Sequence, residues 1–239
     1  MRQEQLDELV SLHEAWFSDN SVGRQLELRG EDLRGVNLAG RRLSDAILED
    51  VDLTGANLHK TKMYQAKLTR VKLYGADLTQ AEFTDARLKN VEFTGANLTE
   101  ALLNNYHGLR DLSFEGTQMN GALFGKTSID NVSFRGVPLR GANFKRGSIG
   151  PASFEGCDLR EANFERAILA DVDLRGADVT GADFSFTRVK LIRVHGLIGF
   201  PADAEGIVIG KVDLSPAGDG SEIIDGEEWL LLRKAAPVV

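Results

Sequence analysis

The chain has 239 residues, 42% of them hydrophobic and 27% charged, and its 36 acidic and 28 basic residues give a net charge of −8. This mixture excludes a disordered chain and is typical of one sizeable globular domain. The first ten residues are acidic and polar, and no apolar run approaches the ~20 residues of a membrane span, so we expect a soluble, cytoplasmic protein. A single cysteine, Cys157, excludes an internal disulfide and a cysteine-based zinc site, in agreement with a reducing compartment.

The N-terminal segment, residues 1–22, is predicted to contain an amphipathic helix over residues 3–18. Its apolar face comprises Leu6, Leu9, Val10, His13, Trp16 and Phe17. The acidic residues lie mostly away from this face. We interpret the helix as a cap on the N-terminal end of the region that follows.

A period of five residues dominates the next 170 positions. In VDLTGANLHKTKMYQAKLTR, residues 51–70, an aliphatic residue occurs at every fifth position, a spacing that fits neither a helix nor a strand. The large apolar residue recurs from Leu28 to Val194 in thirty-four units, with a small or β-branched residue two positions earlier and usually Asp or Asn between them. The unit is therefore A-(D/N)-L-x-x.

A second period of 20 residues is superimposed on the first, because every fourth unit ends in glycine. The nine glycines are Gly35, Gly55, Gly75, Gly95, Gly116, Gly136, Gly156, Gly176 and Gly196. A turn that holds its residue at φ > 0 is the usual reason for such a column. Four units therefore make one coil with four corners, and one corner is a glycine ladder.

The period slips by one residue at positions 104–108, after sixteen units, or four whole coils. The columns keep step across the slip, which indicates a bulge at one corner and not a hinge between domains. Leu102 and Leu123 occupy an outward position that is usually polar, and the bulge adds Tyr106 beside them. These three residues form a candidate contact for a protein partner, with stray surface hydrophobic residues as the alternative.

Stacked coils should bring equivalent side chains to about 4.8 Å from one another. Two columns on opposite sides of the coil are rich in phenylalanine and are predicted to form aromatic ladders in the core: Phe93, Phe114, Phe134 and Phe154 in one, and Phe124, Phe144, Phe164 and Phe184 in the other. Glu31 and Arg41 occupy nominally inward positions of the first coil. We expect that coil to be irregular, or these side chains to pass around its end.

Beyond Gly196 the repeat stops, and residues 197–239 form a segment of different character. A short strand is expected at 206–212, and a second apolar run follows a turn signal. The candidate cap and dimer residues are Ile207, Ile209, Ile223, Trp229 and Leu231. This is more apolar surface than one end of a coil stack needs, so the segment is expected to cap the stack, to bury its surplus against a second copy, or to do both.

Motifs for catalysis, cofactors or metals do not emerge from the sequence. Cys157 occupies an inward position where alanine is the norm, which favours a packed thiol over a reactive one. The four histidines fall in different columns, and the aspartates recur at one outward position of the unit, as expected for turn-bonding side chains. We therefore expect no enzyme, no cofactor and no metal.

The repeated unit resembles the pentapeptide-repeat family over roughly residues 26–194. The resemblance implies an all-β solenoid, a right-handed quadrilateral β-helix of about 8.5 coils, over residues 23–196. Members of this family such as Qnr and MfpA are dimeric rods whose acidic surface imitates DNA on gyrase or topoisomerase IV. The resemblance thus implies a topoisomerase modulator or a factor for resistance to topoisomerase poisons. The alternative is a docking scaffold for another protein, or a structural protein.

The charge distribution does not favour DNA mimicry by this chain. The acidic excess lies in the two terminal segments, which leaves 23 acidic and 24 basic residues in the repeats. One coil carries five cations, namely Lys60, Lys62, Lys67, Arg70 and Lys72. Direct binding to nucleic acid is not expected either, because a nearly neutral rod lacks the basic stripe that phosphate contacts require.

Overall fold

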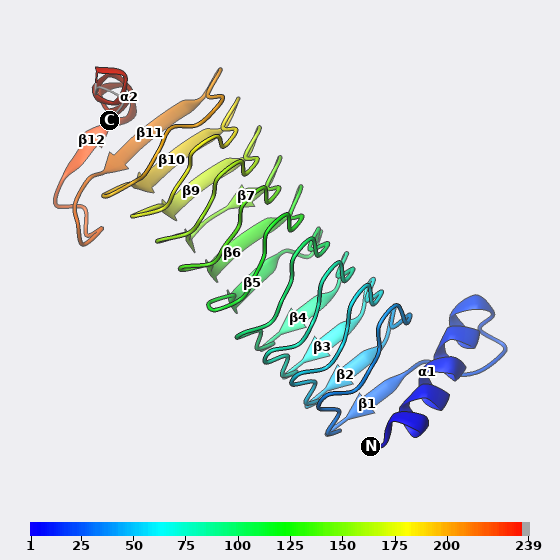
Figure 1. The fold of residues 1–239 in the computed structure, drawn as a ribbon. Coiled ribbons are helices and arrows are strands. Elements are labelled where there is room, and N and C mark those ends of the chain that lie inside the picture. The colour runs from blue at the N-terminus through cyan, green and yellow to red at the C-terminus, as the bar shows by residue number, and fades with distance from the viewer. Residues whose placement is uncertain (236–239) are drawn as a thin grey trace.

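The computed structural model describes residues 1–235, with side chains to residue 230, and shows an elongated β-solenoid of about nine turns with a helix at each end (Figure 1). Helix α1 spans Gln3–Ser18 and α2 spans Gly226–Ala235. The first sheet contains β1 (Glu27–Arg29), β2 (Ile47–Glu49), β3 (Lys67–Thr69) and β4 (Arg87–Lys89). The second contains β5 (Leu109–Ser113), β6 (Ser128–Ser133), β7 (Ser148–Ile149), β8 (Ala152–Ser153), β9 (Ile168–Asp173), β10 (Arg188–Arg193), β11 (Val208–Asp213) and β12 (Ile223–Asp225).

Equivalent residues of successive coils are paired twenty positions apart, as the second sequence period predicts. Leu48, for example, pairs in parallel with Leu28 on one side and Leu68 on the other. Between the coils that flank the slip the offset becomes 21, as for Leu102 and Leu123. The slip is therefore a one-residue bulge inside a continuous stack, and the predicted quadrilateral β-helix is confirmed.

Backbone hydrogen bonds explain both the stacking and the square section. The N–H of Leu53 donates to the carbonyl oxygen of Lys72 in the next coil at 2.8 Å, whereas Ala56 closes its corner by donating to Leu53 at 3.0 Å. The Oδ1 of Asp52 accepts the N–H of Thr54 at 3.0 Å. The same two-residue bond recurs at many outward Asp and Asn positions, which confirms their predicted role in the turns.

The glycine ladder has the predicted left-handed backbone, with φ between 60° and 75° at all nine glycines. Seventeen non-glycine residues in the described chain share this conformation. Lys60 (φ 55°) and Glu161 (φ 61°) are among them, in the same column as Gly141 (φ 68°). Left-handed backbone is thus a property of the corners in general. A Cβ placed on Gly136 would meet nothing within 4 Å, so crowding does not explain the glycine column.

Both aromatic ladders are present in the core. Within each ladder the ring centroids of successive coils are 4.8–5.2 Å apart, and all eight rings are at most 7% exposed. The ladders also contact each other edge to face, as where Phe144 and Phe154 have centroids 5.4 Å apart. Two of the four inward columns in the second half are therefore joined into one cluster of aromatic rings.

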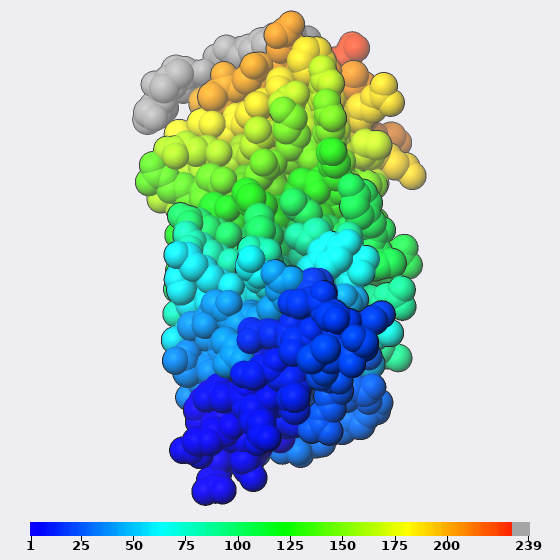
Figure 2. Space-filling model, turned by 90° about the vertical axis from the view of Figure 1, so that its right-hand side faces the viewer, coloured from blue at the N-terminus to red at the C-terminus, as the bar shows by residue number. Residues whose placement is uncertain are grey.

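Helix α1 covers the N-terminal end of the stack, as predicted (Figures 1 and 2). Its residues Leu6, Val10 and His13 are completely buried. The Nδ1 of His13 accepts the N–H of Leu26 at 3.0 Å, and burial lowers the pKa of this imidazole. The unprotonated ring thus accepts the hydrogen bond of the Leu26 N–H, which has no preceding coil to which it could donate.

The irregular first coil is joined to α1 by ion pairs. Arg41 passes around the end of the coil, as expected, and its guanidinium lies 3.0 Å from the carboxylate of Glu14 and 3.4 Å from that of Asp7. The carboxylate of Glu31 lies 3.8 Å from the amino terminus of Met1. The charged side chains of Glu31 and Arg41 therefore bind the N-terminal segment to the first coil.

The parallel stack extends past Gly196, although the sequence motif fades there. Strand β11 pairs with β10 twenty residues apart, as for Val189 and Ile209, so the coil stack reaches Asp213 and not the boundary at 196 that the sequence indicated. Strand β12 then adds to β11 in the antiparallel sense and leads into α2. Within residues 1–235, no helix combines the length and apolarity needed to cross a bilayer.

The ladders give a direct test of the core. Phe134 is fully buried and stacks on rings 5.2 and 4.9 Å away, so Phe134→Ala should lower the free energy of unfolding by about 3–5 kcal/mol. Asn143→Ala removes only an outward turn bond and should cost about 0.5–1.5 kcal/mol. Chemical denaturation followed by circular dichroism measures both, and equal midpoints would contradict the inward placement of the ring.

Candidate protein-contact surfaces

The one-residue bulge is a well-bonded corner. Asn105 turns inward and is 3% exposed; its N–H donates to the hydroxyl of Thr127 at 3.0 Å and its Oδ1 accepts the N–H of His107 at 2.8 Å. The carboxylate of Asp85 accepts the N–H of Tyr106 at 2.9 Å. These bonds fix the backbone from which the tyrosine projects.

Tyr106 is 81% exposed, more than any other large hydrophobic residue whose side chain the structure describes. Leu102 and Leu123 are neighbours in adjacent coils, as the columns predict. Both are partly buried, so the exposed apolar pair expected from the sequence is not present. Stacking causes the difference, because an outward side chain is covered by the equivalent side chains above and below it. The candidate contact is therefore centred on the tyrosine.

A shallow depression of about 540 Å³ lies beside the bulge, lined by Asn104, Tyr106, Lys126, Lys145 and Arg146 among others. The Oδ1 of Asn104 is buried there without a hydrogen-bond partner in the described chain. Analysis of the sequence alone missed these polar residues. The period of 20 could have indicated two of them, because it places Lys126 and Arg146 one above the other in a single column.

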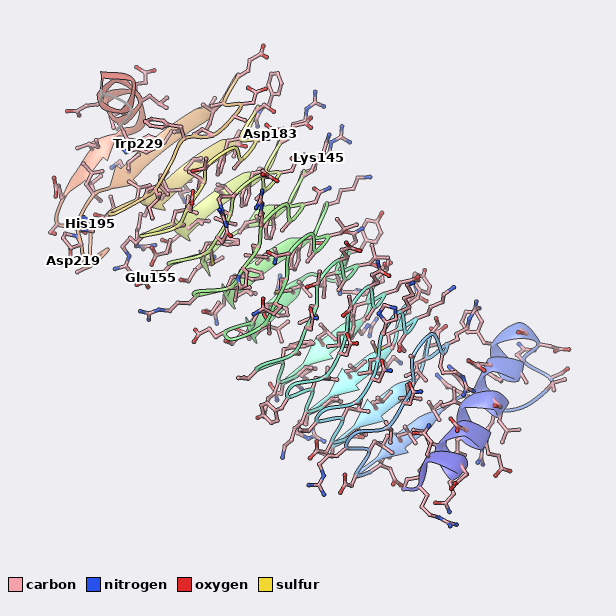
Figure 3. All side chains as sticks on the ribbon, in the orientation of Figure 1. Lys145, Glu155, Asp183, His195, Asp219 and Trp229 are labelled. Atoms are coloured by element: carbon pink, nitrogen blue, oxygen red, sulfur yellow. The ribbon has the colours of Figure 1, made fainter. Side chains whose placement is uncertain are left out.

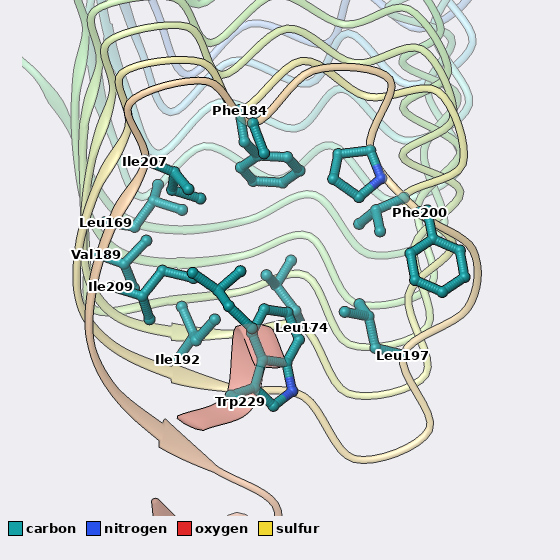
Figure 4. A pocket seen from close by; sticks show the side chains of 14 residues that line it. Leu169, Leu174, Phe184, Val189, Ile192, Leu197, Phe200, Ile207, Ile209 and Trp229 are labelled. Carbon is teal, nitrogen blue, oxygen red and sulfur yellow. The ribbon is translucent and has the colours of Figure 1, made fainter. Parts of the chain in front are cut away.

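The C-terminal end of the stack is an open apolar hollow of about 320 Å³, with Trp229 of α2 at its rim (Figure 4). Ile207 and Ile209 line it, as members of the predicted cap. Ile223 lies on β12 and is 46% exposed. The side chain of Leu231, the fifth predicted residue, lies outside the described residues.

Neither a reactive thiol nor a metal site is supported by the geometry of the cysteine and of the candidate metal ligands in the described part of the chain. Cys157 is 1% exposed, its thiol donates to the carbonyl oxygen of Phe134 at 2.8 Å, and burial raises its pKa to about 12. Such a thiol is a packing group and not a nucleophile at neutral pH. Among the residues that the structure describes, no three His, Cys, Asp or Glu side chains gather as metal ligands would.

The family model for pentapeptide repeats matches eight copies of the repeat, over residues 32–70, 66–105, 109–146 and 152–185. These matches cover more than half of the chain, so the protein belongs to the pentapeptide-repeat family. No curated protein matches the chain in sequence.

Two solved structures have a related fold. One is HetL, a pentapeptide-repeat protein involved in regulating heterocyst differentiation in the cyanobacterium Nostoc sp. strain PCC 7120, which is 20% identical, with 83% of this chain and 90% of that chain covered and a TM-score of 0.37. The other is QnrB1, a plasmid-mediated fluoroquinolone resistance protein, which is 16% identical, with 90% and 98% covered and a TM-score of 0.33. At these identities the likeness concerns the fold alone.

The apolar rim of the C-terminal end predicts self-association. Val208, on the last parallel strand, is 62% exposed, and we expect light scattering to give about twice the 26.1 kDa mass of one chain. Val208→Asp should reduce this mass to that of a monomer. Ile168→Asp, at the equivalent and 48% exposed position two coils earlier, is the matched control and should change nothing. A monomeric mass for the unaltered protein would contradict the prediction.

Proposed function

We propose that this protein is a non-enzymatic, cytoplasmic interaction rod that binds another protein through the bulge and the surface around it. The observation that carries the proposal is Tyr106, 81% exposed on a corner whose backbone is held by three side-chain hydrogen bonds. An aromatic ring on a fixed backbone loses little conformational entropy when a partner covers it.

A type II topoisomerase is the first partner that we propose to test, because members of this family bind that class of enzyme. The surface of this chain does not favour recognition through a line of carboxylates. Arg70, for example, lies 2.6 Å from the carboxylate of Asp50 and 2.8 Å from that of Glu49, so charges of opposite sign already pair between coils. We therefore place the contact at the bulge. A docking scaffold for a different protein is the alternative.

A photoreactive amino acid in place of Tyr106 tests the contact surface. In an extract of the source cells, irradiation should give a discrete protein adduct. The same substitution for Tyr64, which is 40% exposed and lies on the same side of the rod two coils earlier, is the matched control. An adduct that forms equally from both positions, or from neither, would refute the proposed surface.

A supercoiling assay with DNA gyrase, with and without a quinolone, tests the named partner. At micromolar rod, we expect inhibition of supercoiling or protection against the drug. Tyr106→Ser should lose the effect because the variant lacks the exposed ring. Should neither inhibition nor protection occur, the topoisomerase proposal is wrong and the docking-scaffold alternative is retained.

A further inference from the structure

The side of the rod that bears the bulge carries cations on successive coils. Residues twenty or twenty-one positions apart lie next to each other in adjacent coils, and several such neighbours form ion pairs of opposite charge. Such pairs are Arg70 with Asp50, Arg135 with Glu155 and Arg140 with Glu161, at 2.6–3.2 Å. Pairing of this kind is expected, because like charges directly opposite one another destabilise neighbouring strands.

At the corner that follows the bulge, three successive coils present Lys126, Arg146 and Arg166 in one column. Lys145 projects next to them, on the edge of the rod opposite Glu155 (Figure 3). Glu165 is the carboxylate that contacts this group, through Lys145 and Arg166. Within the described residues, Lys126 and Arg146 have no ion-pair partner. We call Lys126, Lys145, Arg146 and Arg166 the cationic column.

Two features of the depression show what kind of anion would suit it. Lys126, Lys145 and Arg146 line it together with Tyr106, so positive charge and an aromatic ring face the same space. The buried Oδ1 of Asn104 also lines it and lacks a donor. Leaving a buried acceptor without a partner is costly, so a ligand that brings an N–H group is favoured over a bare anion.

We infer that the depression and the cationic column bind an acidic peptide segment of a partner protein. Carboxylates of the segment pair with Lys126 and Arg146, a backbone N–H donates to Asn104, and an apolar side chain packs on Tyr106. The column spans two coil spacings, or about 10 Å, which matches two or three residues of an extended peptide. A nucleic-acid backbone would continue past this column onto a rod that carries 23 acids against 24 bases.

The inference rests on the proposed function and names the chemistry of the partner. We would titrate the full-length protein into a fluorescein-labelled peptide of alternating Glu and Leu and follow fluorescence anisotropy. Saturable binding is expected, weakened as NaCl rises from about 50 mM to about 0.5 M. The double variant Lys126→Gln, Arg146→Gln should weaken binding by about tenfold or more.

The matched control is the double variant Lys72→Gln, Arg135→Gln, which removes the same charge from the opposite side of the rod. It should bind like the unaltered protein. Because all four residues are exposed, thermal unfolding should be similar in both variants, which separates lost binding from lost folding. Equal weakening by both variants would show attraction by overall charge and overturn the inference.

Three further outcomes would also overturn the inference. The acidic peptide could fail to bind, or a peptide of alternating Gln and Leu could bind equally well. The third outcome is complete displacement of the labelled peptide by sodium phosphate or by a short oligothymidylate at the concentration of the peptide. The photocrosslink separates this result from the proposed function. An adduct at Tyr106 without acidic-peptide binding would leave the contact surface standing and reject only the chemistry assigned to the partner.

Discussion

Hydrogen bonding between neighbouring coils is the constraint on which the whole molecule depends. Each coil donates backbone N–H groups to the next, so residues twenty positions apart must stack about 4.8 Å from one another. A side chain therefore has to be compatible with its equivalents above and below. Rings stack on rings in the core, glycines follow glycines at one corner, and several outward neighbours form ion pairs. The same constraint brings Lys126, Arg146 and Arg166 next to one another in the cationic column.

This constraint also explains why so much of the fold could be predicted from sequence. A period of five with a superimposed period of 20 defines the inward positions, so the ladder through Phe134 follows from counting. The cap through Leu6 and Val10 follows from the helical spacing of its apolar residues. The bulge could be placed because the columns keep step on both sides of it. The repeated features are determined by the stacking of equivalent residues in adjacent coils, and the sequence period shows which residues are equivalent.

Other features depend on contacts that periodicity does not encode. Lys60 and Glu161 adopt left-handed backbone without being glycine, so the conformation of a corner cannot be inferred from glycine alone. The coil beyond Gly196 persists because β10 offers a hydrogen-bonding edge to β11, although the motif has decayed. The period of 20 places Lys126 and Arg146 in one column, but the hollow beside the bulge and the burial of Asn104 depend on contacts between several coils, so the polar site was missed.

The two ends of the rod differ in a way that limits how copies can assemble. The N-terminal end is closed by α1, whose carboxylates hold Arg41 and whose apolar face is buried, whereas the C-terminal end retains an open apolar hollow. A head-to-tail filament would need two complementary ends, and the residues that the structure describes leave only one end open. Association through the C-terminal end would join two like ends and close after two copies, so the helix that caps the N-terminal end would also prevent growth into a fibre.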